Sequence, residues 1–162
     1  MSKKFHLKLV TKNNSFLSKE KTYLFMGKWC EIGLKNRSRI KYKILKNPWL
    51  DKSKKEKNYK IIFKQYLKMK KFLTNYLNMA HKKKYSEKYW DQIFGHWLIN
   101  FISLYQEKKL LINQLRNNTI LYYDFIDIKN DSYVPLNSSQ AHVFFQNDLW
   151  NGNLFSILIS KL

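Results

Sequence analysis

The sequence has few of the residues that disulfide-rich, fibrous or disordered proteins need. Its 162 residues include one cysteine, two prolines and four glycines. Because Cys30 stands alone, it cannot form an intramolecular disulfide or a multi-cysteine zinc site, which fits a reducing compartment. The low glycine and proline content, with 44% hydrophobic and 17% aromatic residues, excludes a linker or a disordered tail. We therefore expect one folded domain.

Long apolar runs are also missing. The first twelve residues hold only a short apolar stretch, which is too short for the apolar region of a signal peptide. No segment approaches the roughly 20 consecutive apolar residues of a membrane-spanning helix. The sequence therefore predicts a cytoplasmic protein, with any contact with the inner membrane confined to the membrane surface.

Acidic residues are scarce: 11 Asp and Glu face 31 Lys and Arg, which gives a formal net charge of +20. A basic field attracts nucleic acids and anionic lipids alike. Bidentate recognition of phosphate or guanine favours arginine, however, and only Arg37, Arg39 and Arg116 are arginines. We therefore disfavour nucleic acid as a partner. A basic nucleic-acid or anionic-surface binding module remains the alternative function.

Short apolar segments predict three strands. They lie at 5–10, 23–26 and 119–123, and one further extended piece is expected at 40–45 within a basic loop. Strands that alternate with helices indicate an α/β fold with a short parallel sheet, which we expect to be Rossmann-like. Three strands are few for such a sheet, so we expect residues 1–162 to form a single, truncated N-terminal domain of a longer protein.

Apolar residues at three- and four-residue steps predict long helices. Ser53 and Glu56 match a capping box, and the helix that starts there should place its apolar stripe, from Tyr59 to Ala80, on the core. A second, largely buried helix should start at Ser86. Two shorter helices are expected, one capped by Asn137 or Ser138 and running to Phe145, and one over 149–162.

The segment Gly27-Lys28-Trp29-Cys30 follows a predicted buried strand, at the edge where open α/β sheets bind ligands. Gly27 would let the backbone approach a ligand, and Trp29 could stack on a sugar or a base. The alternative interpretation is a tight turn in which Trp29 and Cys30 belong to the core, as these residue types commonly do.

The segment Asn147-Asp148-Leu149-Trp150-Asn151 combines amides, a carboxylate and an indole, which suits hydrogen bonding and stacking with a sugar ring. Alternatively, Asn147 or Asp148 caps the helix and Trp150 is buried. His96 and Asp148 are the candidates for a catalytic base. The histidines lack the spacing of a zinc site, so no metal is expected. P-loop, G-x-G-x-x-G and G-x-S-x-G motifs are absent.

Several of these segments together resemble the N-terminal region of a family of bacterial transferases from surface-polysaccharide and capsule loci. The resemblance spans nearly the whole chain. Its motifs are Leu9-Val10-Thr11, Phe25-Met26-Gly27-Lys28-Trp29-Cys30, Tyr89-Trp90 with Phe94-Gly95-His96-Trp97-Leu98, and Asn147-Asp148-Leu149-Trp150-Asn151. His96 departs from the family pattern, which tends to have proline between the glycine and the tryptophan.

The resemblance implies the acceptor-side part of a glycosyltransferase-like (GT-B-like) enzyme, inactive alone, that needs a nucleotide-sugar donor but no cofactor of its own. It implies a carbohydrate acceptor, and a C-terminal half encoded downstream that binds the donor. The substrate-binding residues that it implies are Gly27, Trp29, Cys30, Trp90, Gly95, Trp97, Asn147, Asp148, Trp150 and Asn151.

Overall fold

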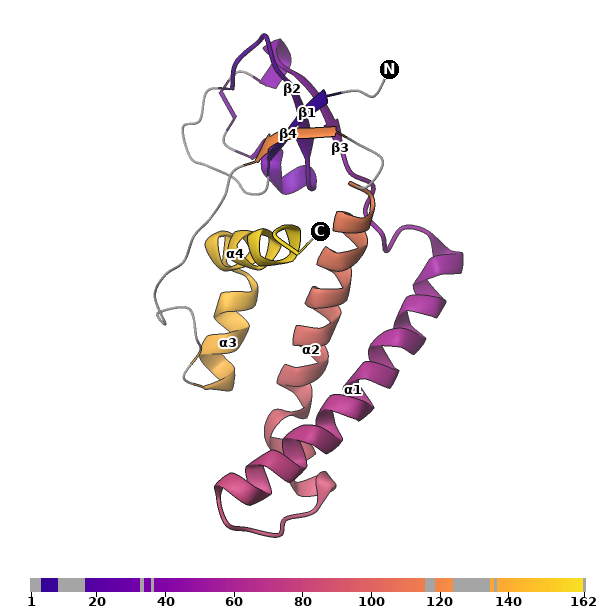
Figure 1. Cartoon of the computed structure of the whole chain (residues 1–162), viewed down its shortest axis with the longest axis vertical. Helices are drawn as coiled ribbons and strands as arrows, with labels where there is room; N and C mark the ends of the chain where they lie inside the picture. The colour runs from indigo at the N-terminus through magenta and orange to yellow at the C-terminus, as the bar shows by residue number, and fades with distance from the viewer. Residues whose placement is uncertain are drawn as a thin grey trace.

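The computed structural model describes residues 4–8, 17–32, 34–35, 37–115, 119–123, 135 and 137–161. The protein is mixed α/β, with a sheet at one end and a long helical hairpin extending away from it (Figure 1). Leu9-Val10-Thr11 lies outside the described residues. The strands are β1 (Lys4–Lys8), β2 (Thr22–Phe25), β3 (Lys41–Ile44) and β4 (Thr119–Tyr123), and the helices are η1 (Lys28–Glu31), η2 (Arg37–Arg39), α1 (Lys52–Ala80), α2 (Glu87–Asn113), α3 (Ser138–Phe145) and α4 (Asp148–Ile159).

The four strands form a parallel sheet in the order β3-β2-β1-β4. The first and last strands along the chain are neighbours, and Phe5 pairs with Ile120. The three strands expected from the apolar segments are confirmed. The extended piece at 40–45 is a fourth strand, β3, whose exposed Lys41 and Lys43 alternate with half-buried residues. Lysines that point to solvent protect an edge strand from further pairing, which explains why its sequence resembles a basic loop.

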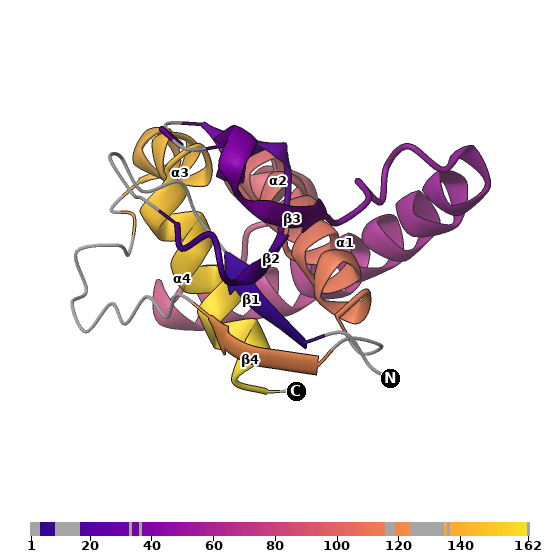
Figure 2. The ribbon, with the colours of Figure 1, turned by 90° about the horizontal axis from the view of Figure 1, so that it is seen from above.

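The main core lies between the sheet and the two helices beneath it. Leu24, Phe25 and Met26 are fully buried, and so is Cys30 in η1. The last turns of α2 and the middle of α4 pack against them through Leu111, Ile112 and Phe155. The helix α4 lies across the underside of the sheet, whereas α2 runs toward the sheet and is seen nearly end-on from above (Figure 1 and Figure 2). The sequence interpretation of Cys30 as a core residue therefore agrees with its burial.

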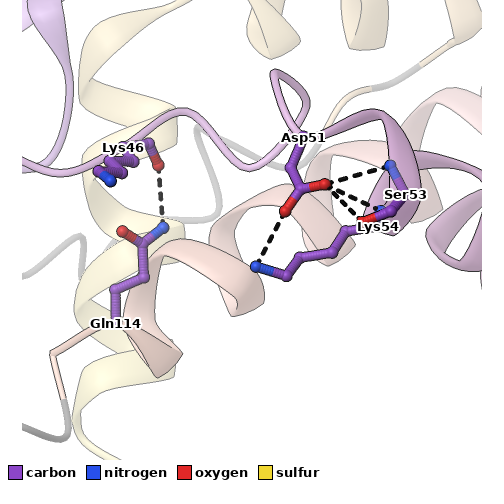
Figure 3. Close-up of polar contacts among 5 residues, drawn as sticks. All are labelled: Lys46, Asp51, Ser53, Lys54 and Gln114. Atoms are coloured by element: carbon purple, nitrogen blue, oxygen red, sulfur yellow. Dashed lines mark hydrogen bonds and ion pairs between the residues drawn. The ribbon is translucent and has the colours of Figure 1, made fainter.

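The helices α1 and α2 form an antiparallel hairpin with a smaller core of Ile62, Leu98 and Ile102. Ser86 caps α2 by accepting a hydrogen bond from the Tyr89 amide, and Asn137 and Asn147 cap α3 and α4. The predicted capping box of α1 is wrong. Asp51 is the N-cap, and its side chain accepts hydrogen bonds from the amides of Ser53 and Lys54 (Figure 3).

The predicted core face of α1 is only partly buried. Ile62 is buried, but Phe63 is 57% exposed and Phe72 is 61% exposed. One neighbouring helix cannot cover so wide an apolar face, because a packed helix buries a stripe of roughly 100°. None of the helices in the described ranges combines the length and the apolar character that crossing a membrane requires.

Candidate functional site

A cavity of about 440 Å³ opens at the carboxyl ends of β2 and β3. We call it the sheet-edge cavity. Gly27 and Trp29 line it from the segment after β2, and Lys46 and Asn47 line it from the loop after β3. Glu107 and Leu111 of α2 close its floor. This is the edge at which open α/β sheets bind ligands.

The loop after β3 is fixed on both sides of this cavity. The side-chain amide of Gln114, just after α2, donates a 2.9 Å hydrogen bond to the carbonyl oxygen of Lys46. A few residues later, Asp51 caps α1 and forms a 3.0 Å ion pair with Lys54 (Figure 3). The cavity wall is therefore held by backbone and cap contacts and needs no ligand to form.

A second cavity, of about 510 Å³, lies between α1, α2 and α3. We call it the helix cavity. Trp49 and Tyr59 stack at one side of it, with ring centroids 5.7 Å apart. Its polar residues are Asn100, Ser103, Glu107, His142 and Gln146. Aromatic faces with a few amide and carboxyl groups are the usual lining of a site for a polar ring such as a sugar.

Glu107 lines both cavities, and no other carboxylate of the described residues does so. Its side chain is half-buried. Within the described part of the chain, Glu107 forms neither an ion pair nor a side-chain hydrogen bond, so its oxygens are free to accept a proton or a hydroxyl group. Sequence reasoning missed Glu107. The sequence feature that could have indicated Glu107 is a carboxylate on the largely apolar helix α2, one turn before Leu111.

Lys108, the next residue, points away from solvent and is only 5% exposed. Its ammonium lies 5.0 Å from the ring centroid of Phe155, which stacks on Trp29 with a centroid distance of 6.5 Å. Burial lowers the pKa of Lys108, and the charge of Glu107 opposes this shift. No carboxylate pairs with Lys108 among the residues that the structure describes.

Gly27 and Trp29, both predicted to contact a ligand, also contact each other. The indole of Trp29 lies against the α-carbon of Gly27, where a β-carbon would overlap it. Gly27 is buried and extended, so the absence of a side chain makes room for Trp29. Both residues still line the sheet-edge cavity, whereas Cys30 does not.

Trp97 and Trp150, both predicted to bind substrate, lie in one aromatic cluster. The ring of Trp97 stacks on Phe101 at 5.5 Å, and Trp150 lies 5.3 Å from Phe145. Phe145 also lines the helix cavity, so this cluster forms part of its wall. Asn151 donates from its amide to the carbonyl oxygens of Phe145 and Asn147. The side-chain oxygen of Asn151 is buried and has no hydrogen-bond partner among the residues that the structure describes.

Of the remaining predicted residues, Trp90, Gly95 and His96 line neither cavity. Trp90 is buried at the far end of the hairpin, and Gly95 faces Tyr66 and Asp91. His96 is exposed on α2 and lies 3.1 Å from Asn100. Asp148 begins α4, but its side chain lies outside the described residues. Their functional roles stay predictions. Among the described residues, no three His, Cys, Asp or Glu side chains gather to hold a metal.

Comparison with protein families gives a match over nearly the whole chain. The model of a family described as LIC12162 family transferase covers residues 7–162. No curated protein and no solved structure gives a significant match. The match covers the sheet-edge cavity, the helix cavity and every predicted substrate-binding residue.

Proposed function

Since the chain belongs to the LIC12162 transferase family, we propose that it forms the acceptor-binding side of a glycosyltransferase-like enzyme of bacterial surface-polysaccharide synthesis. The observation that carries the proposal is Glu107, the carboxylate shared by two adjoining cavities. The strand order β3-β2-β1-β4 supports a Rossmann-like assignment, because it equals the first four strands of that fold.

The helix cavity supplies the acceptor contacts in this proposal. A sugar ring would lie along Trp49 and Tyr59, and its hydroxyl groups would bond to Asn100, Gln146 and His142. Burial of a polar ligand needs several such partners, because each unpaired hydroxyl group costs free energy. The polar residues of this cavity meet that requirement from α2 and from α3 with its C-cap, Gln146.

Glu107 is the proposed general base. An acceptor hydroxyl in the helix cavity attacks the anomeric carbon of the donor, and its proton passes to the carboxylate of Glu107. The new bond joins the acceptor oxygen to that carbon. The bond from the carbon to the nucleoside diphosphate breaks, and the diphosphate leaves with the electron pair. The donor reaches Glu107 from the sheet-edge cavity, bound by a C-terminal half encoded downstream, so that this chain is inactive alone.

The test is a transfer assay on the chain co-expressed with the downstream product, with nucleotide sugars as donors and oligosaccharides as acceptors. Glu107→Gln should lower turnover by about 10²–10⁴-fold, the range for removal of a general base, and leave acceptor affinity within about threefold. Tyr59→Ala should instead weaken acceptor binding. Glu56→Gln is the matched control, because Glu56 is exposed, pairs with Lys60 and lines neither cavity.

Acceptor binding by the chain alone gives an independent readout. Saturation-transfer NMR should show contact between saccharides and the aromatic residues of the helix cavity, and Tyr59→Ala should remove it. Unchanged turnover in Glu107→Gln would exclude this residue as the base. If saccharides contact neither the chain alone nor the chain co-expressed with the downstream product, the acceptor assignment is overturned.

A further inference from the structure

The connection between α1 and α2 is the point of the molecule farthest from the sheet (Figure 1). We call the residues around it, 76–93, the hairpin tip. Four exposed lysines lie here: Lys82, Lys83, Lys84 and Lys88. The tip has two acids, Glu87 and Asp91, and Asp91 already pairs with Lys70 of α1. Within the described residues, none of the four lysines forms an ion pair. The tip therefore presents an uncompensated positive charge.

Large apolar side chains are exposed beside these lysines. Met79 is 71% exposed, and the rings of Tyr85 and Tyr89 lie 4.2 Å apart with both residues 41% exposed. Tyr76 and Ile93 extend the apolar surface along the two helices. Tyrosine has an apolar body and a polar hydroxyl, which suits the boundary between water and lipid.

The tip is held in one conformation by Asn78. Its side chain donates to the carbonyl oxygen of Tyr85 at 2.9 Å and accepts from the Tyr85 amide and the Trp90 indole. Lys82 adopts a left-handed backbone with φ of 53°, which reverses the chain after α1. Because these contacts fix the backbone before binding, docking would cost little further conformational entropy.

We propose that the hairpin tip docks on the surface of an anionic phospholipid bilayer. The lysines match the negative charge of the headgroups, and the tyrosines, Met79 and Ile93 match the boundary with the acyl chains. Nucleic acid fits less well, because the tip has no arginine, and a phosphate backbone gains nothing from exposed Met79 and Ile93. Neither cavity includes a residue of the tip.

The proposal is tested by sedimentation of the full chain with vesicles of phosphatidylcholine alone and of phosphatidylcholine with 30 mol% phosphatidylglycerol. Binding should require the anionic lipid and fall with salt. Each lysine near such a surface contributes about fivefold to partitioning, so Lys82→Gln/Lys83→Gln/Lys84→Gln should weaken binding on the order of a hundredfold. Met79→Ser/Ile93→Ser should weaken it at unchanged charge.

The control, Lys35→Gln/Lys41→Gln/Lys43→Gln, removes the same charge at the sheet end of the molecule, where these lysines are also exposed. It should bind within about threefold of the wild type. Equal loss in control and tip variants would overturn the proposal in favour of diffuse charge. Loss of binding to a DNA duplex with unchanged vesicle binding in the tip variant would assign the tip to nucleic acid instead. Saccharide binding should be intact in all variants, which separates this inference from the proposed acceptor site.

Discussion

The indole ring of Trp29 lies against the α-carbon of Gly27, in the segment that leads from β2 into the wall of the sheet-edge cavity. The Trp29 ring also stacks on Phe155 of α4. Position 27 therefore sets where Trp29 lies, and Trp29 in turn connects the sheet edge to a helix more than 120 residues later in the sequence.

Gly27→Ala should lower the free energy of unfolding by about 1–3 kcal/mol, the usual cost of adding atoms to a packed site. Urea denaturation measures the change. In a Trp29→Leu background the same substitution should cost clearly less, because the overlapping ring is gone. Equal costs in the two backgrounds would show that the ring is not the reason for glycine at this position.

A second relationship joins the two long helices: the hydroxyl of Tyr66 on α1 donates a hydrogen bond to Asp91 on α2. Gly95 lies beside it, and a β-carbon there would meet the Asp91 carboxylate. Tyr66→Phe should lower stability by about 1 kcal/mol, the net value of one such bond. Gly95→Ala should also destabilise, and less so when Asp91 is alanine. Thermal unfolding of the single and double variants tests both statements.

The same contact predicts a pH dependence. Burial, and then the hydrogen bond to Asp91, raises the pKa of Tyr66 to about 12 from its ordinary 10.0. A raised pKa in the folded protein means that the stabilisation is complete below pH 10 and is lost as the pH rises from 10 to about 12. Absorbance of tyrosinate should show one residue titrating near the top of this range. Tyr66→Phe should remove it, and persistence of that step in the variant would assign it to another tyrosine.

Replacement of Lys108 by methionine should stabilise the protein at pH 7 on the order of 1–3 kcal/mol, because a buried ammonium that pairs with no described carboxylate is costly. Burial lowers the pKa of Lys108 below its ordinary 10.5, so the unfolded chain binds the proton more tightly. The cost is therefore complete below the lowered pKa and disappears as the pH rises toward 10.5. The stability gap between variant and wild type should narrow over that window. A gap that is constant with pH would show that packing, and not charge, causes it.

Asp51 predicts a pH dependence of stability in the acidic range. The hydrogen bonds from Ser53 and Lys54 lower the pKa of its carboxyl group to about 2 from 3.8. Since the folded pKa is lowered, the stabilisation is present above pH 3.8 and is lost as the pH falls toward 2. Asp51→Asn keeps an N-cap acceptor but removes the charge, whereas Asp51→Ala removes both. At pH 7 the urea midpoint should therefore be highest for the wild type, lower for Asp51→Asn and lowest for Asp51→Ala. At pH 2.5 the midpoints of the wild type and Asp51→Asn should converge.

Features that depend on a few neighbouring residues were predictable from the sequence. Ser86, Asn137 and Asn147 mark helix starts because a cap bonds to amides only two or three residues away. At α1 the same capping rule identifies the wrong residue. Asp51, two residues before Ser53, is the N-cap and accepts a hydrogen bond from the Ser53 amide. The sequence predicts only an extended piece within a loop at β3, because its lysines reflect an edge position that only the assembled sheet defines.

The candidate site shows the same division. Gly27 and Trp29 could be placed at a sheet edge because a strand end is a local feature. Glu107 could not be identified as a candidate from the sequence, because it lines two cavities whose walls come from distant segments. The apolar face of α1 was also misjudged, since helical spacing shows that residues share a face but not how much of it a neighbour covers.

The pairing of Phe5 with Ile120 has a consequence for synthesis on the ribosome. The strand β1 is made well before its partner β4, which follows the complete α1–α2 hairpin. The hairpin depends on contacts between neighbouring segments, which form quickly, whereas the sheet must close over a long intervening chain. Until then β1 has an unpaired edge that can associate with other chains. We therefore expect slow elongation before residue 120 to increase aggregation of nascent chains, while the hairpin itself is already folded.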